Sequence, residues 1–351
     1  MPGAGAAPLA QGPRARPVGV LLPLTGKLGD IGQAMLRAAQ LALSGPGAPR
    51  LISADTLGTV PGVQAGLRDV LGNGAGLILG PLTAAETEAA AGIASGAAIP
   101  VLAFTNTVSA ARPGVWTLGI TPVQQVDRLM SYAVPQGRTR FAALLPNNDF
   151  GAAMAQALTA AAASRGIAPP AVRLHDRGPD AISASVRDLV GPGTPPLPFN
   201  VLLLGDTGAA LTEIVAALST ASVGPPSVQI IGPALWGAPA SGSDQVLGGW
   251  YAAPDPAARV AFTQAFAARY DAPPPGPADL AYDAASIARV LAPQGYSQAA
   301  LTNPAGFSGV DGWLRLLPDG RVQRGLAVFQ VAASGARIIS PAPMTASAFA
   351  A

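Results

Sequence analysis

The chain has 351 residues, half of them hydrophobic, which is enough for two domains that each bury a core. The formal net charge is +2 and the basic residues are scattered singly, so nucleic-acid binding has little support. The chain has no cysteine, which excludes disulfides, zinc–thiolate sites and cysteine nucleophiles.

The first 16 residues are rich in Pro, Gly and Ala and lack the apolar segment of a signal peptide. We expect them to form a flexible linker. No stretch of the chain reaches the roughly 18 consecutive apolar residues of a transmembrane segment. If the protein is exported, its signal is expected to lie outside this sequence.

A first series of strands and helices follows. Asp30 precedes one amphipathic helix, Pro61 and Gly72 bound a second, and Thr83 and Glu86 form a capping-box pattern at the start of a third. Apolar runs of strand length lie at 18–24, 51–54, 77–79 and 100–104. Strands separated by helices in this way predict βαβ units and a parallel sheet.

A second series begins after Thr121-Pro122. We expect strands at 141–145, 172–174, 201–204 and 229–231, with helices at 151–165, 181–190 and 209–219 between them. The chain therefore holds two successive βα arrays, each with its own sheet.

The C-terminal part has a different pattern. A strand at 249–253 precedes two helices, at 256–270 and 278–292. A β-ribbon is expected from 312–317 and 326–331, with Pro318-Asp319-Gly320 in its turn. The last ten residues are expected to form a loose tail.

Seven segments of the chain carry a family resemblance: VGVLLPLTGKLGDIGQAM, ISADTLGT, LILGPLT, IPVLAFTN, RFAALLPNNDFG, AYDAASIARVL and FSGVDGWLRLLPDGRVQRGLAVFQV. Their order resembles that of the type I periplasmic-binding proteins, in particular the leucine/isoleucine/valine-binding group. The resemblance implies an α/β fold of two Rossmann-like lobes with parallel sheets, joined by three hinge crossings near 118–122, 251–254 and 322–325. It further implies a flexible linker at 1–16, lobe 1 at 17–119 plus 255–322, lobe 2 at 120–254 plus 323–342, and a tail at 343–351. A small-molecule ligand would bind in the cleft between the lobes, which would close on it by bending at the hinge.

Ligands of open parallel sheets bind beyond the carboxyl ends of the strands, where helices begin and offer N–H groups. At these ends we expect ligand-binding residues in lobe 1 at Thr83, Phe104, Thr105 and Asn106, and in lobe 2 at Asn148, Phe150, Asp206 and Trp236. Several have a second interpretation. Thr83 also fits a helix cap, and Thr105 and Asn106 also fit a turn.

The resemblance implies roles for some of these positions. Thr83 and Thr105 match hydroxyl residues that hold a ligand carboxylate, and Phe150 matches a covering aromatic residue without its phenolic hydroxyl. Asp206 stands where the family has an aromatic residue, and we interpret it as the cap of the helix starting at Gly208 in preference to a partner for a cation. Ala234-Leu235-Trp236 stands where a family glutamate pairs with the ligand ammonium group. Branched-chain amino acids are therefore expected to bind weakly or not at all.

The resemblance implies a non-enzymatic solute receptor of an ABC-type importer in the periplasm, with an amino-acid-like or other small polar ligand. The importer's membrane subunits would be its partners. The alternative is a penicillin-binding protein activator, a lipoprotein-type regulator that binds a cell-wall synthase, because PLTGKLGDIGQAMLRAAQLAL and LGPLTAAET are similar to that branch. An enzyme is a distant third. His175 beside Asp176 is the single histidine and is interpreted as structural, and no G-x-S-x-G or G-x-x-x-x-G-K-[ST] sequence occurs. No catalytic residue, cofactor or metal is expected.

Overall fold

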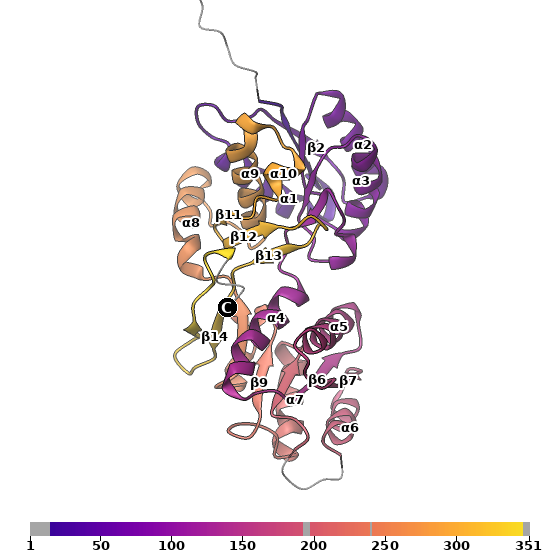
Figure 1. Ribbon diagram of the computed structural model, residues 1–351, viewed down its shortest axis with the longest axis vertical. Helices are drawn as coiled ribbons and strands as arrows, with labels where there is room; N and C mark the ends of the chain where they lie inside the picture. Colours follow the sequence, from indigo (N-terminus) through magenta and orange to yellow (C-terminus); the bar gives the residue numbers. More distant parts are fainter. Residues whose placement is uncertain (1–14, 192–196, 239–240, 347–351) are drawn as a thin grey trace, which may run out of the picture. The chain divides into compact units, whose positions relative to one another are not determined.

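The computed structural model describes residues 15–191, 197–238 and 241–346 (Figure 1). The chain divides into two compact units. Unit 1 comprises Met1–Gly119, Ala261–Asn303 and Leu316–Val322, and unit 2 comprises Ile120–Val260, Pro304–Arg315 and Gln323–Ala351. The predicted linker up to residue 14 and the predicted tail from residue 347 lie outside the described residues. This division differs from the predicted lobes at 255–260 and 304–315, and the predicted lobe boundaries stay a prediction.

Unit 1 is built on a parallel sheet of five strands in the order β2-β1-β3-β4-β5. All but β2 are wholly buried, because helices cover both faces of the sheet. The strands are β1 (Val18–Leu22), β2 (Leu51–Asp55), β3 (Leu77–Leu79), β4 (Val101–Ala103) and β5 (Val115–Thr117).

The helices of unit 1 pack in pairs. On one face, α2 (Val60–Gly72) and α3 (Ala84–Gly96) lie side by side and bury Leu67 and Ala91 against Leu21, Ile78 and Val101 of the sheet (Figure 1). On the other face, α1 (Gly29–Ala42) packs against α9 (Ala278–Leu291), which comes from far along the chain. Shorter helices are α10 (Gln298–Leu301) and the 3-10 turn Gly26–Leu28, and α8 (Pro256–Tyr270) crosses the boundary between the units.

Unit 2 has a sheet of seven strands in the order β15-β14-β10-β9-β8-β6-β7. The five strands from β10 to β7 are parallel, and β14 and β15 are added antiparallel at one edge. The strands are β6 (Phe141–Pro146), β7 (Ala171–His175), β8 (Val201–Leu204), β9 (Gln229–Gly232), β10 (Trp250–Ala253), β14 (Ala327–Gln330) and β15 (Arg337–Ser340).

Two helices cover each face of this sheet. The helices α4 (Pro122–Ala133) and α5 (Asp149–Ser164) bury Leu129 and Leu158 in one core. The helices α6 (Pro179–Val190) and α7 (Gly208–Thr220) bury Val186 and Ile214 in the other. Arg128 of α4 ties the C-terminal strand to this unit, because its guanidinium donates to Leu326 O at 2.7 Å and to the Ser340 hydroxyl at 2.6 Å.

The predicted C-terminal ribbon is wrong in one respect. The Pro318-Asp319-Gly320 turn is present, closed by Gly320 N donating to Leu317 O at 3.0 Å. However, β12 (Gly312–Leu316) is flanked by β11 (Phe307–Gly309) and β13 (Val322–Arg324) in a small sheet of three strands. The segment predicted to be its partner, 326–331, contains β14, which joins the sheet of unit 2 because it pairs with β10.

Candidate functional site

The carboxyl end of β3 leads into the cap of helix α3. Thr83 is the N-cap, and its hydroxyl accepts from Glu86 N at 3.3 Å while lying 2.7 Å from Glu86 Oε2. Glu86 Oε2 also accepts from Thr83 N at 3.1 Å, which completes the predicted capping box. A carboxylate can only accept, so the Thr83 hydroxyl proton is committed to Glu86. The structure thus bears out the cap interpretation of Thr83.

The carboxyl end of β4 presents the three remaining candidates of unit 1. Phe104 is buried, and its backbone N–H donates to Pro81 O at 2.9 Å. Thr105 is also buried, and its hydroxyl accepts from Thr107 N at 3.1 Å, which is the predicted turn contact. That contact leaves the hydroxyl proton of Thr105 able to donate. Asn106 is exposed.

In unit 2, the loop after β6 carries two candidates. Asn148 is exposed and caps α5, because its side-chain oxygen accepts from Gly151 N at 2.9 Å. Phe150 is half-buried against the core under α4 and α5. Only part of its ring is therefore available to a ligand at this end of the sheet.

Trp236 follows β9 in a short 3-10 turn and belongs to the core under α6 and α7. Its side chain lies over Gly232, where a Cβ atom would come within 2.3 Å of the indole ring. The indole N–H donates to Asp206 O at 3.0 Å. Trp236 thus supports the strand ends of unit 2, whereas its neighbour Leu235 is 56% exposed.

A buried polar pair at the carboxyl ends of the unit 2 strands is formed by His175 and Asp206. Asp206 Oδ2 lies 3.0 Å from His175 Nε2, and the two side chains are only 10% and 2% exposed. His175 Nδ1 lies 3.0 Å from Asp176 O. Burial lowers the pKa of His175, but the hydrogen bonds to Asp206 and Asp176 and the charges of these two residues outweigh burial and raise the pKa above its ordinary value.

This pair corrects the interpretation of Asp206 as a helix cap. The N-cap of α7 is Thr207, and no side-chain hydrogen bond caps that helix. The partner of Asp206 lies 31 positions earlier in the chain, at the carboxyl end of β7, which β6 separates from β8. A side chain of the protein itself, His175, therefore occupies the carboxylate that the second predicted role of Asp206, pairing with a cation, would use.

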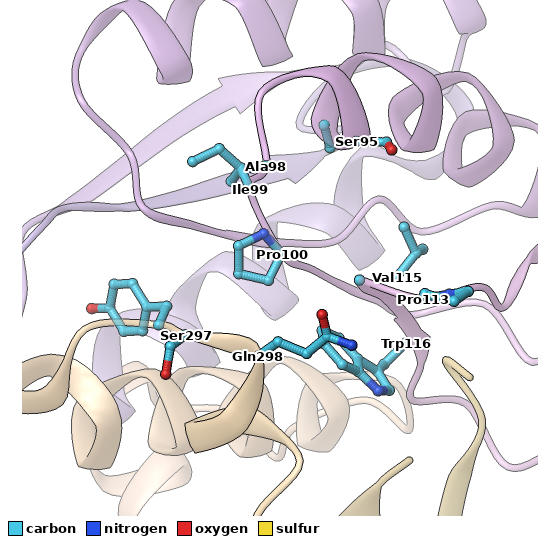
Figure 2. A pocket seen from close by; sticks show the side chains of 12 residues that line it. Ser95, Ala98, Ile99, Pro100, Pro113, Val115, Trp116, Ser297 and Gln298 are labelled. Atoms are coloured by element: carbon cyan, nitrogen blue, oxygen red, sulfur yellow. The ribbon is translucent and has the colours of Figure 1, made fainter. Parts of the chain in front are cut away.

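A surface pocket of about 240 Å³ lies elsewhere in unit 1, and Figure 2 shows Pro100, Trp116, Ser297 and Gln298 around it. Pro100 and Pro113 precede β4 and β5, so the pocket is at the amino ends of these strands. The candidates Phe104 and Thr105 lie at the carboxyl end of β4. Since ligands of parallel sheets bind at the carboxyl ends, we do not assign the pocket to the predicted ligand.

A family model described as periplasmic binding protein matches residues 17–336. The chain belongs to the periplasmic binding protein family. Its fold is accordingly the type I fold, with two parallel-rich sheets, as predicted. The family has a non-enzymatic ligand-binding fold, which confirms the prediction that this periplasmic binding protein is not an enzyme.

Solved structures agree on the fold. A Rhodospirillum rubrum protein provisionally described as a branched-chain amino acid ABC transporter is 21% identical, with a TM-score of 0.77 over 93% of this chain and 100% of its own. LivJ of Streptococcus pneumoniae, a branched-chain amino acid transporter substrate-binding protein in complex with isoleucine, is 15% identical, with a TM-score of 0.60 over 93% and 100%. LpoA of Haemophilus influenzae is 18% identical, with a TM-score of 0.71 over 93% of this chain and 59% of LpoA. Among curated proteins, none matches the chain in sequence.

Within the part of the chain that the structure describes, no helix is both long and apolar enough to cross a membrane.

Proposed function

We propose that the protein is the periplasmic solute receptor of an ABC-type importer and binds a small polar ligand that carries a carboxylate. The observation that carries this proposal is the family match over residues 17–336, nearly the whole chain. Similarity at full length to the Rhodospirillum rubrum protein and to LivJ supports it, because both are described as parts of branched-chain amino acid transporters. The importer's membrane subunits are the proposed partners.

The loops that follow the carboxyl ends of the unit 1 strands supply groups suited to a carboxylate. The N–H groups of Ala84 and Ala85 in the first turn of α3 have no acceptor within the helix, and the helix N-terminus carries a partial positive charge. The Thr105 hydroxyl, after the next strand, has a proton to donate. Because the Thr83 proton is committed to Glu86, Thr105 is the proposed hydroxyl donor and Thr83 the residue that orients the helix start.

Thermal unfolding in the presence of amino acids, their deaminated analogues, amides and small acids tests the proposal. A ligand at 100 times its dissociation constant should add about 2.7 kcal/mol to the free energy of unfolding. The control is the T105V variant, which keeps the side-chain shape and should lose most of the shift with a carboxylate ligand. A complete library without any stabilising ligand would contradict the receptor function.

The alternative proposal is a penicillin-binding protein activator that binds a cell-wall synthase. The similarity in fold to LpoA, at a TM-score of 0.71, supports this alternative. This chain corresponds to 59% of LpoA, so the alternative concerns only the shared part. Binding of a purified synthase domain to the immobilised chain, together with a negative ligand screen, would favour the activator.

A further inference from the structure

The ring nitrogens of His175 both face oxygen atoms that can only accept a hydrogen bond. Nε2 lies 3.0 Å from the Asp206 carboxylate, and Nδ1 lies 3.0 Å from the backbone carbonyl of Asp176. A neutral imidazole has a single N–H and satisfies only one of these acceptors, whereas an imidazolium satisfies both. The contacts therefore fit a charged histidine bound to a charged Asp206.

Neighbouring bonds hold this pair in place. Trp236 Nε1 donates to Asp206 O at 3.0 Å, and Asn147 N donates to His175 O at 2.9 Å. Asn147 also donates from its side chain to Asp176 Oδ1 at 2.9 Å. The carboxylate of Asp206 is thus fixed at the carboxyl end of β8 with a partner already bound.

A ligand ammonium group that is buried at this edge needs a buried acid, because an unpaired buried charge is strongly destabilising. Asp206 is largely buried but is occupied by His175. Three acids that follow β6 and β7, Asp149, Asp176 and Asp180, are exposed to solvent. After β9 the chain offers the exposed apolar side chain of Leu235.

We infer that His175 is a specificity-determining residue: by binding the Asp206 carboxylate as an imidazolium, it makes unit 2 select ligands that bring no ammonium group to this edge. The inference rests on the proposed receptor function and narrows its ligand class to carboxylates without a free amine.

Calorimetry with leucine and 4-methylpentanoate tests this selection, since the two probes share a branched chain and a carboxylate and differ in the ammonium group. The wild-type protein should bind 4-methylpentanoate at least tenfold more tightly than leucine. H175Q keeps an N–H donor for Asp206 but removes the positive charge, so the preference should fall at least tenfold. D206N and the double variant H175Q/D206N lack the acid and should keep the wild-type preference.

Two controls separate charge at the pair from other effects. R173Q removes a cation from the same strand, where Arg173 pairs with Asp188 on the surface, and should leave the preference unchanged. His175 is the single histidine of the chain, so its imidazole resonances can be assigned without ambiguity in an NMR titration. We expect this histidine to remain protonated to a higher pH than a free imidazole, and to lose that shift in D206N.

The inference is overturned if wild-type protein binds leucine as tightly as 4-methylpentanoate, if H175Q leaves the preference unchanged, or if His175 titrates at or below its ordinary pKa. The wild-type comparison and the titration need no variant, so they decide the matter even if H175Q does not fold. Failure of both probes on every variant, together with a thermal-unfolding library in which no ligand stabilises the protein, would contradict the proposed function and the selection that rests on it, even if His175 remains protonated to a raised pH. Tight binding of either probe, with a pKa of His175 at its ordinary value, would contradict this inference but not the proposed function.

Discussion

Replacing Asp206 with Asn should destabilise the protein at low pH much more than at high pH. Both side chains of the pair are nearly buried, at 10% and 2% exposure, and the contact is 3.0 Å long, so solvent screens it little. A hydrogen bond to a charged group contributes about 1.5–3 kcal/mol, and breaking one side of a buried ion pair costs about 3–5 kcal/mol. The Asn side chain still offers an acceptor to Nε2, so we expect a loss of about 2–3 kcal/mol at about pH 6.

The pH dependence follows from the raised pKa of His175. A group with a raised folded-state pKa contributes stability that is complete below its unfolded-state pKa of about 6.5 and is lost as the pH rises through the folded-state pKa. The difference in stability between wild type and D206N should therefore shrink toward about pH 9.5. Comparing the two proteins cancels the titration of other groups.

Urea unfolding followed by circular dichroism at both pH values measures this difference, with R173Q as the surface control. R173Q should lose less than about 1 kcal/mol at either pH, as expected for an exposed pair. A D206N loss that is equal at the two pH values, or that grows at alkaline pH, would refute the assignment of an imidazolium at His175.

Further predictions concern caps, anchors and packing. T83V should lose about 1 kcal/mol of stability in thermal unfolding while T83S retains it, because only the serine keeps the capping hydroxyl. T105V should weaken binding of a carboxylate ligand by about 1.5–3 kcal/mol in calorimetry, and an unchanged affinity would exclude this hydroxyl from the site. R128Q should increase hydrogen exchange in β15 at least tenfold relative to β6, since the guanidinium holds the end of that strand. G232A should cost about 1–3 kcal/mol and change the near-ultraviolet dichroism, because its methyl group collides with the ring of Trp236.

Local signals in the sequence predict much of the fold. The β3 strand and the α8 helix have the predicted bounds, and Thr83 forms the predicted capping box, because the apolar run, the helical pattern and the cap can each be recognised in consecutive residues. The prediction missed β5, a strand of three residues that is set by pairing with β4. It also assigned 326–331 to the wrong partner, because the pairing of β14 with β10 joins residues more than 70 positions apart.

In the candidate site, too, local features could be predicted from the sequence and contacts between distant residues could not. Strand ends could be placed from the sequence, and so could the cap formed by Thr83. The partner of Asp206 could not, because His175 is brought beside it only by the packing of β7 and β6 against β8. Trp236 likewise has its side chain in the core, which a position next to a strand end does not indicate. The ligand-binding roles of the eight candidates stay predictions.

The sheet of unit 2 is completed by strands that the chain supplies last. Between β10 and β14 the chain contributes α9 to unit 1, so neither unit is a continuous segment. During synthesis or passage through a narrow channel, β10 would keep an unpaired edge until residues 327–330 emerge. Both units must therefore finish folding late and almost together, and a chain cut after β13 would leave an aggregation-prone edge instead of a stable separate domain.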